Sequence, residues 1–267
     1  MSKAFLDTTI LVDGLLKRGE PRTKALAALR RYDFAEFPIY AIKEFKAGAL
    51  YNWVWLYNKL KDTGSHAKTL AAIKAVMAYK KNRAATALEG LAELERGQRA
   101  TFGDLQAEYG KQADPDSVAA ERLRLAARVR IFTAWRKRNS LGTPVVPLPC
   151  YMEKDPYEGR DGLLSCSPMV CDDKPECSMA PALRARNADL VKLREAVSKQ
   201  PSKAENTRRS RALKELIRNR PLTDSLCRSL GDAVFALFAP ADAVVLTTNI
   251  GDHQPLAEAL GKRVEAP

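Results

Sequence analysis

The chain has 267 residues, of which 46% are hydrophobic and 28% charged, with a formal net charge of +12. This balance is typical of globular proteins and excludes a chain that is disordered throughout. Five cysteines do not make a disulfide framework at this length, and no apolar run is long enough for a membrane-spanning helix. We therefore expect a cytoplasmic protein that does not contact a membrane.

The positive charge is concentrated in the middle of the chain. Residues 61–220 hold 31 Lys and Arg against 20 Asp and Glu, whereas the two ends together hold 13 against 12. Such a surplus costs self-repulsion, and a polyanionic partner is the usual reason to tolerate it. The distribution predicts nearly neutral ends and a basic middle that contacts nucleic acid.

The first elements place two acids next to regular structure. The opening segment AFLDTTILV is rich in β-branched residues and predicts a short buried strand, with Asp7 near its carboxyl end. TKALAALRRY then has helical spacing. The segment EFPIYAIKEFKAGALYNWVWLYNKLK predicts an extended piece broken at Pro38 and a long amphipathic helix, with Glu44 near the start of that helix.

The middle and end of the chain differ in pattern. Residues 65–140 are almost entirely helical in pattern, residues 141–181 are irregular and rich in Pro and Cys, and helical spacing returns before Pro221. The remainder predicts helix, strand, helix and strand. We therefore expect an α/β core from residues 1–60 and 221–267, interrupted by a mainly helical basic insertion at 61–220.

Acids at strand ends can build a catalytic centre. Ligands of an open parallel sheet bind at the carboxyl ends of the strands, where Asp7 and the segment before Asp252 are expected. Clustered carboxylates that hold hard divalent cations can activate water and neutralise the charge that develops during phosphodiester hydrolysis. The sequence therefore predicts that both ends of the chain converge on one acidic site.

Four segments resemble the motifs of PIN-domain nucleases: FLDTTILVDGL, AIKEF, SLGDAVFALFA and VVLTTNIGDHQPLAE. The resemblance covers residues 1–60 and 220–267, roughly 40% of the chain. It assigns the family's four acids to Asp7, Glu44, Asp232 and Asp252. Two features depart from the family pattern: nearly 190 residues separate the second motif from the third, and His253 follows Asp252 where an aromatic residue is common.

The resemblance implies a three-layer α/β/α fold with a central parallel sheet. It also implies that the four acids hold one or two Mg²⁺ or Mn²⁺ ions, while Thr9, Thr248 and Asn249 orient a carboxylate or water. The implied function is an endoribonuclease whose products carry a 5′-phosphate, in the manner of a toxin or defence effector. An inhibitory protein partner and a homodimer are further expectations from the family.

Other interpretations of the same residues stay open. Asp7 could cap the helix that follows it, Glu44 and Asp232 could be solvated first-turn acids, and His253 is expected to be exposed. A DNA or flap-type nuclease is one alternative function. A nucleic-acid-binding scaffold that no longer cuts is another.

The insertion carries two further sets of candidate residues. Three basic clusters could contact phosphates, with Tyr79 or Trp135 available to stack on bases: Lys80, Lys81 and Arg83; Arg136, Lys137 and Arg138; Arg208, Arg209 and Arg211. Four cysteines could bind a structural Zn²⁺, although they form no CxxC pair: Cys150, Cys166, Cys171 and Cys177. Solvated helix faces and free thiols are the alternatives, and Cys227 is expected in the core.

Overall fold

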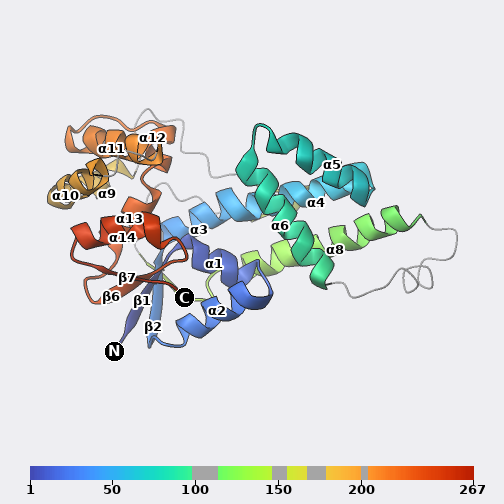
Figure 1. Cartoon of the computed structure of the whole chain (residues 1–267), viewed down its shortest axis with the longest axis horizontal. Coiled ribbons are helices and arrows are strands. Elements are labelled where there is room, and N and C mark those ends of the chain that lie inside the picture. Colours follow the sequence, from blue (N-terminus) through green and yellow to red (C-terminus); the bar gives the residue numbers. More distant parts are fainter. Residues whose placement is uncertain (98–113, 146–154, 167–178, 200–203) are drawn as a thin grey trace.

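A computed structural model of the chain describes residues 1–97, 114–145, 155–166, 179–199 and 204–267. It is an α/β protein built on one five-stranded parallel sheet (Figure 1). The strands are β1 (Lys3–Leu6), β2 (Phe34–Pro38), β3 (Thr143–Val145), β6 (Ala243–Leu246) and β7 (Arg263–Glu265). Their order is β3-β2-β1-β6-β7, so β1 lies between β2 and β6. Because Leu6 pairs with Leu246, the carboxyl ends of β1 and β6 lie side by side.

Helices cover both faces of this sheet. Those nearest to it are α1 (Thr8–Leu15), α2 (Gly19–Leu29), α3 (Ile39–Phe45), α13 (Gly231–Phe238) and α14 (Ile250–Ala259). From β1 the chain adds β2 and β3 on one side, and later β6 and β7 on the other. Because crossovers between parallel strands are right-handed, the helices of these two halves lie on opposite faces: α1 to α3 on one, α13 and α14 on the other. The contacts of α1 with α2 and α3, and of α13 with α14, agree with this grouping. The predicted α/β class and parallel sheet are confirmed, and the arrangement is consistent with three layers.

The first strand is shorter than the sequence pattern predicts. The apolar run continues to Val12, but β1 ends at Leu6 and α1 begins at Thr8. Asp7 has an extended backbone, and its side chain accepts a hydrogen bond from the Thr9 backbone N–H, as an N-cap residue does. The residues that follow therefore bury their apolar face as a helix and not as a strand.

A nearly continuous helical rod connects the core to the first half of the insertion. It runs from α3 through the π-helix η1 (Lys46–Leu50) into α4 (Tyr51–Thr63), and Gly64 ends it in the left-handed conformation, with φ of 56°. Three further helices pack along α4: α5 (His66–Met77), α6 (Lys81–Gly97) and α8 (Pro115–Arg136). In Figure 1 this group extends away from the sheet to the right. No helix within the described ranges, α8 included, has the length and apolarity to cross a membrane.

The second half of the insertion packs against the C-terminal part of the core, where α10 (Asn187–Ser198) contacts α14. It contains the hairpin of β4 (Tyr157–Glu158) and β5 (Leu164–Ser165), followed by α9 (Ala180–Arg184), α10 and α11 (Ala204–Ile217), and the short helix α12 (Asp224–Arg228) comes just after it. The hairpin is attached to α4, since the Asn58 side chain bonds both backbone groups of Leu164 at 2.8 Å. The α10–α11 pair packs beside α14, so this half of the insertion reaches the carboxyl edge of the sheet.

The core sheet includes a strand from within residues 61–220, the segment that was expected to be an insertion. Thr143–Val145 lie inside that segment, yet they form β3 and pair in parallel with Glu36–Pro38 of β2. The segment therefore divides into two helical parts, with an edge strand of the core between them. A strand of three residues that contains Pro144 has too little apolar alternation to be recognised in the sequence.

The pairing of β3 with β2 depends on close backbone approach at Gly142. A Cβ added at Gly142 would lie 2.7 Å from the Ala35 carbonyl oxygen, whereas one added at Gly48 would meet nothing within 4 Å. We expect Gly142→Ala to lower the free energy of unfolding by about 1–3 kcal/mol, because backbone must shift, and Gly48→Ala to be neutral or slightly stabilising. Urea unfolding of both variants checks this. Equal midpoints for the two would contradict the pairing.

Candidate active site

Asp7 is a buried carboxylate at the centre of the sheet's carboxyl edge, 3% exposed. Its Oδ2 atom accepts hydrogen bonds from the Thr9 hydroxyl at 2.7 Å and from the Thr247 hydroxyl at 2.8 Å. Thr247 directly follows β6, so the pairing of β1 with β6 brings these groups together. The same carboxylate thus caps α1 and joins the two ends of the chain.

Glu44 lies beside Asp7 on α3. Its Oε2 accepts a hydrogen bond from the Thr8 hydroxyl at 2.7 Å. The first residue of α13 comes so close that a Cβ on Gly231 would lie 2.5 Å from Glu44 Oε1. The pKa of Glu44 is raised to about 8. Burial is the largest cause, and the negative charges of Asp7 and then Asp232 contribute to the same shift. At neutral pH this carboxyl group therefore holds its proton most of the time.

Asp232, in the first turn of α13, is the third carboxylate of the cluster. Burial raises its pKa, and the positive charges of Arg209 and His253 offset part of that effect. The Nη2 atom of Arg209 donates a short hydrogen bond to Asp232 Oδ2. Arg209 belongs to α11 and is 2% exposed; its other nitrogens donate to the Ser229 carbonyl at 3.2 Å and to Asn206 Oδ1 at 3.1 Å. The insertion therefore contributes a buried guanidinium to the site.

His253 lies between two of the acids. Its Nε2 is 3.5 Å from Asp7 Oδ1 and 3.4 Å from Asp232 Oδ1, and its ring meets the Phe235 ring edge-on at 5.7 Å. Burial alone would lower the pKa of His253, but the hydrogen bond and charge of Asp7, followed by the other two carboxylates, raise it. The expectation of an exposed His253 was wrong, since the residue is 2% exposed.

Asp7 stays ionised because of these partners. Burial by itself would raise its pKa, yet hydrogen bonding and charge attraction from His253, together with the hydroxyls of Thr9 and Thr247, lower it overall. The cluster thus holds one anionic carboxylate, one that is mostly protonated, and one paired with a guanidinium. The three carboxyl groups therefore share one electrostatic environment.

Asp252 has a different setting from the other three acids. Its Oδ2 accepts a hydrogen bond from the Asn249 side chain at 2.8 Å, and it lines a small cavity with Asn206 and Arg209. It precedes His253 on α14, and successive helical residues point about 100° apart. Thr248 is exposed and contributes its backbone N–H to the Thr9 hydroxyl at 3.1 Å. The structure therefore brings Asp7, Glu44 and Asp232 together and leaves Asp252 at the rim.

The donor set fits a hard divalent cation in its chemistry. Carboxylate oxygens are the ligands that Mg²⁺ and Mn²⁺ prefer, and three carboxyl groups meet here. In their present positions, however, no three His, Cys, Asp or Glu side chains among the described residues are arranged to hold a metal ion. The two oxygens of Asp232 already face His253 and Arg209. Rotation of Asp232 away from these partners would free it for a cation.

Three functional residues were missed by the sequence analysis, although two of them carry a periodic signal. Arg209 shares a helical face with buried Ala212, Leu213 and Leu216, which identifies an inward-facing arginine. His253 precedes buried Leu256 and Ala257 in the same way. The role of Thr247 depends on which residue ends β6, and a strand boundary is not visible at that precision in a sequence.

The basic clusters of the insertion have mixed surroundings. Arg209 is buried and does not form an exposed phosphate contact, so that prediction is corrected. Arg83 and Arg138 are half-buried and lie over the rings of Tyr51 and Trp135, at 5.0 Å and 4.3 Å. Trp135 is itself buried and donates to Asp155, which contradicts a role in base stacking. The exposed members are Lys80, Lys81, Arg136, Lys137, Arg208 and Arg211.

The zinc prediction falls largely on residues that the structure does not describe. Cys150, Cys171 and Cys177 lie outside the described residues. Cys166 is a buried free cysteine, and burial raises the pKa of its thiol to about 11. Cys227 is buried in the core, as expected.

In comparisons with protein-family models, curated proteins and solved structures, nothing matches this chain. The PIN resemblance therefore remains an expectation that depends on the four sequence motifs. Any statement on function depends on the residues and geometry of the site.

The pair of buried Arg209 and half-buried Asp232 is expected to stabilise the fold. Removing Arg209 leaves the Asp232 charge uncompensated, so Arg209→Gln should lower the free energy of unfolding by about 2 kcal/mol, less than for a fully buried pair. Exposed Arg211 on the same helix is the matched control, and Arg211→Gln should change it by less than about 0.5 kcal/mol. A double-mutant cycle with Asp232→Asn, measured by urea unfolding, should give a coupling above about 1 kcal/mol. Additive effects would mean that the two residues do not pair.

Proposed function

We propose that this protein is a metal-dependent nuclease that hydrolyses phosphodiester bonds, with an endoribonuclease as the specific form. The observation that carries the proposal is the convergence of Asp7, Glu44 and Asp232 from three elements at the carboxyl edge of a parallel sheet. Ligands bind at this edge in open parallel sheets. The order of the four PIN-like motifs supports the same activity.

Asp7, Glu44 and Asp232 are the residues that would hold Mg²⁺ or Mn²⁺. When bound, such a cation supplies Lewis acidity at a phosphoryl oxygen and lowers the pKa of water. Thr9 and Thr247 fix one oxygen of Asp7, so its other oxygen has a defined direction. Because the pKa of Glu44 is about 8, cation uptake at neutral pH releases a proton from this carboxyl group.

RNA is the proposed substrate on two grounds. The net charge of +12 suits a polyanion, and the PIN-like motifs imply RNA cleavage by a toxin or defence effector. An inhibitory protein partner and dimerisation belong to the same proposal. Neither has a specific residue assigned to it.

A nucleic-acid-binding scaffold without catalysis is the second candidate, and one observation favours it. Asp232 has both oxygens next to cationic side chains of the chain itself, Arg209 and His253. In this form of the site, two protein groups compensate charge that a metal would otherwise compensate. Cleavage assays separate the two candidates.

The test uses labelled single-stranded RNA, single-stranded DNA and duplexes, each with Mg²⁺, Mn²⁺ or EDTA. We expect the parent to cut RNA only with a divalent cation, and Asp7→Asn to be slower by at least about 100-fold because the central ligand charge is lost. Asparagine can still cap α1, so the fold is retained.

Asp62→Asn is the matched control, since Asp62 is exposed on α4 and pairs only with Lys59 among the described residues. It should cut at the parental rate. The absence of any metal-dependent cleavage by the parent would favour the scaffold. Equal cleavage by the parent and Asp7→Asn would refute the assigned site.

A further inference from the structure

A groove outside the carboxylate cluster lies between the α1–α2 corner and α8. It has a volume of about 750 Å³. One wall contains Arg18, Arg22 and Thr23, and the opposite wall contains Arg130, Thr133 and Lys137. Its floor includes Gly14 and Leu15 at the end of α1. In Figure 1 the α1–α2 corner lies near one end of α8.

All the charged side chains among the described residues that line this groove are positive. Arg18, Arg22 and Lys137 are exposed, and Arg130 is half-buried. No described carboxylate forms an ion pair with any of these four side chains, in contrast to two nearby lysines that are paired, Lys17 after α1 and Lys24 on α2. Four cations that face each other across a concave surface repel, and a polyanion in the groove relieves that repulsion.

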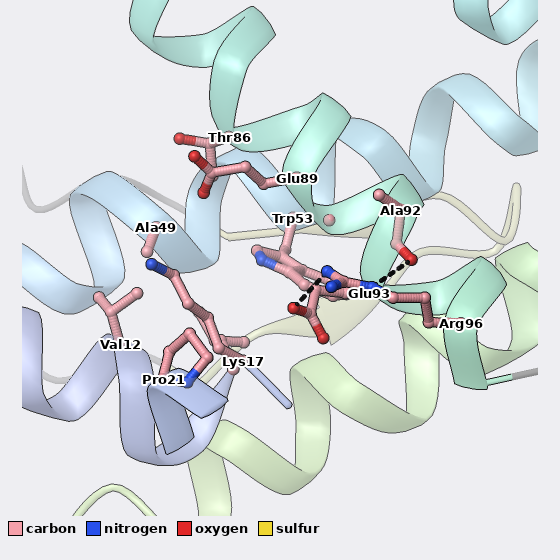
Figure 2. Close-up of a pocket in the computed structure, with 12 residues that line it drawn as sticks. Val12, Lys17, Pro21, Ala49, Trp53, Thr86, Glu89, Ala92, Glu93 and Arg96 are labelled. Atoms are coloured by element: carbon pink, nitrogen blue, oxygen red, sulfur yellow. Dashed lines mark hydrogen bonds and ion pairs between the residues drawn. The ribbon is translucent and has the colours of Figure 1, made fainter. Parts of the chain in front are cut away.

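A second cavity on the other side of the α1 end has a different character, which Figure 2 shows. It has a volume of about 270 Å³, and its charged lining is balanced: Lys17 and Arg96 against Glu89 and Glu93. Arg96 pairs there with Glu93 at 2.8 Å. Trp53 provides an apolar surface in the same cavity. The unbalanced positive charge is therefore specific to the first groove.

The groove is connected to the carboxylate cluster by α1. Asp7 caps the first turn of this helix and Gly14 lies near its last, seven residues later. With a rise of 1.5 Å per residue, the separation along the helix is about 10 Å. The groove and the carboxylate cluster therefore lie at the two ends of the same short helix.

We propose that this groove binds the sugar-phosphate backbone of a single-stranded nucleic acid, with Arg18, Arg22, Arg130 and Lys137 contacting phosphates. Arginine forks bind phosphate oxygens in pairs, and the hydroxyl of Thr133 can donate to the same groups. The choice of nucleic acid as the polyanion rests on the proposed nuclease function. Of the three basic clusters predicted from the sequence, Lys137 lines this groove and the other members do not.

The test is equilibrium binding of a fluorescein-labelled single-stranded RNA in EDTA, followed by fluorescence anisotropy. Arg22→Gln with Lys137→Gln removes one exposed cation from each wall. Arg30→Gln with Arg128→Gln is the matched control, since both residues are exposed, lie beside or on the same two helices, α2 and α8, and lie outside the groove. Both double variants lower the net charge equally. Far-ultraviolet circular dichroism verifies that each is folded.

We expect the groove variant to bind about tenfold more weakly and the control to bind like the parent. The slope of log affinity against log salt should fall by about 1.4 in the groove variant, because each single-strand phosphate contact contributes roughly 0.7. Equal weakening in both variants, or parental affinity in the groove variant, overturns the proposal. So does a parent that binds poly-glutamate in the groove and no RNA.

Binding in EDTA is independent of catalysis, so the two proposals fail separately. A parent that binds RNA through the groove but never cuts it refutes the nuclease and leaves the groove standing. A parent that cuts RNA with unchanged affinity and rate in the groove variant refutes the groove and leaves the nuclease standing.

Discussion

The burial of Asp7 at the end of the central strand is the constraint on which the site depends. An ionised carboxylate out of water costs several kcal/mol unless other groups compensate it. Its partners come from both ends of the chain: Thr9 from α1, Thr247 after β6, and His253 from α14. This single requirement fixes where β1 ends, how β6 is placed beside it, and which side of α14 faces the core.

The same constraint connects the insertion to the core. Asp7 alone could be satisfied by hydroxyls and His253, but Glu44 and Asp232 add two more carboxyl groups to the same low-dielectric region. The chain responds in two ways: Glu44 keeps its proton, and Arg209 reaches in from α11 to pair with Asp232. The second half of the insertion is thus part of the site. A change in the position of α11 would alter the charge that Asp232 presents.

The sequence was sufficient for the parts of this account that depend on local pattern. The apolar strands of the α/β core and the helical character of the insertion follow from residue type and spacing, whereas the clustered acids were expected from the resemblance of four motifs to a known family. The rest depends on distant contacts. The helical spacing of Arg209 marks it as inward-facing, but its partner Asp232 is known only once α11 lies beside the start of α13, and β3 is recognisable only by its pairing with β2. The end of β1 was missed because Asp7 starts a helix within an apolar run.

The central claim is that Asp7, Glu44 and Asp232 share one electrostatic environment. Carbon-13 NMR of the side-chain carboxyl groups, followed through a pH titration in EDTA, measures this directly. Glu44, identified by comparison with Glu44→Gln, should titrate with a midpoint near 8, as burial and the charge of Asp7 require. The midpoint should fall in Asp7→Asn, where the nearest negative charge is gone. An ordinary midpoint near 4.5, unchanged in Asp7→Asn, would contradict the account.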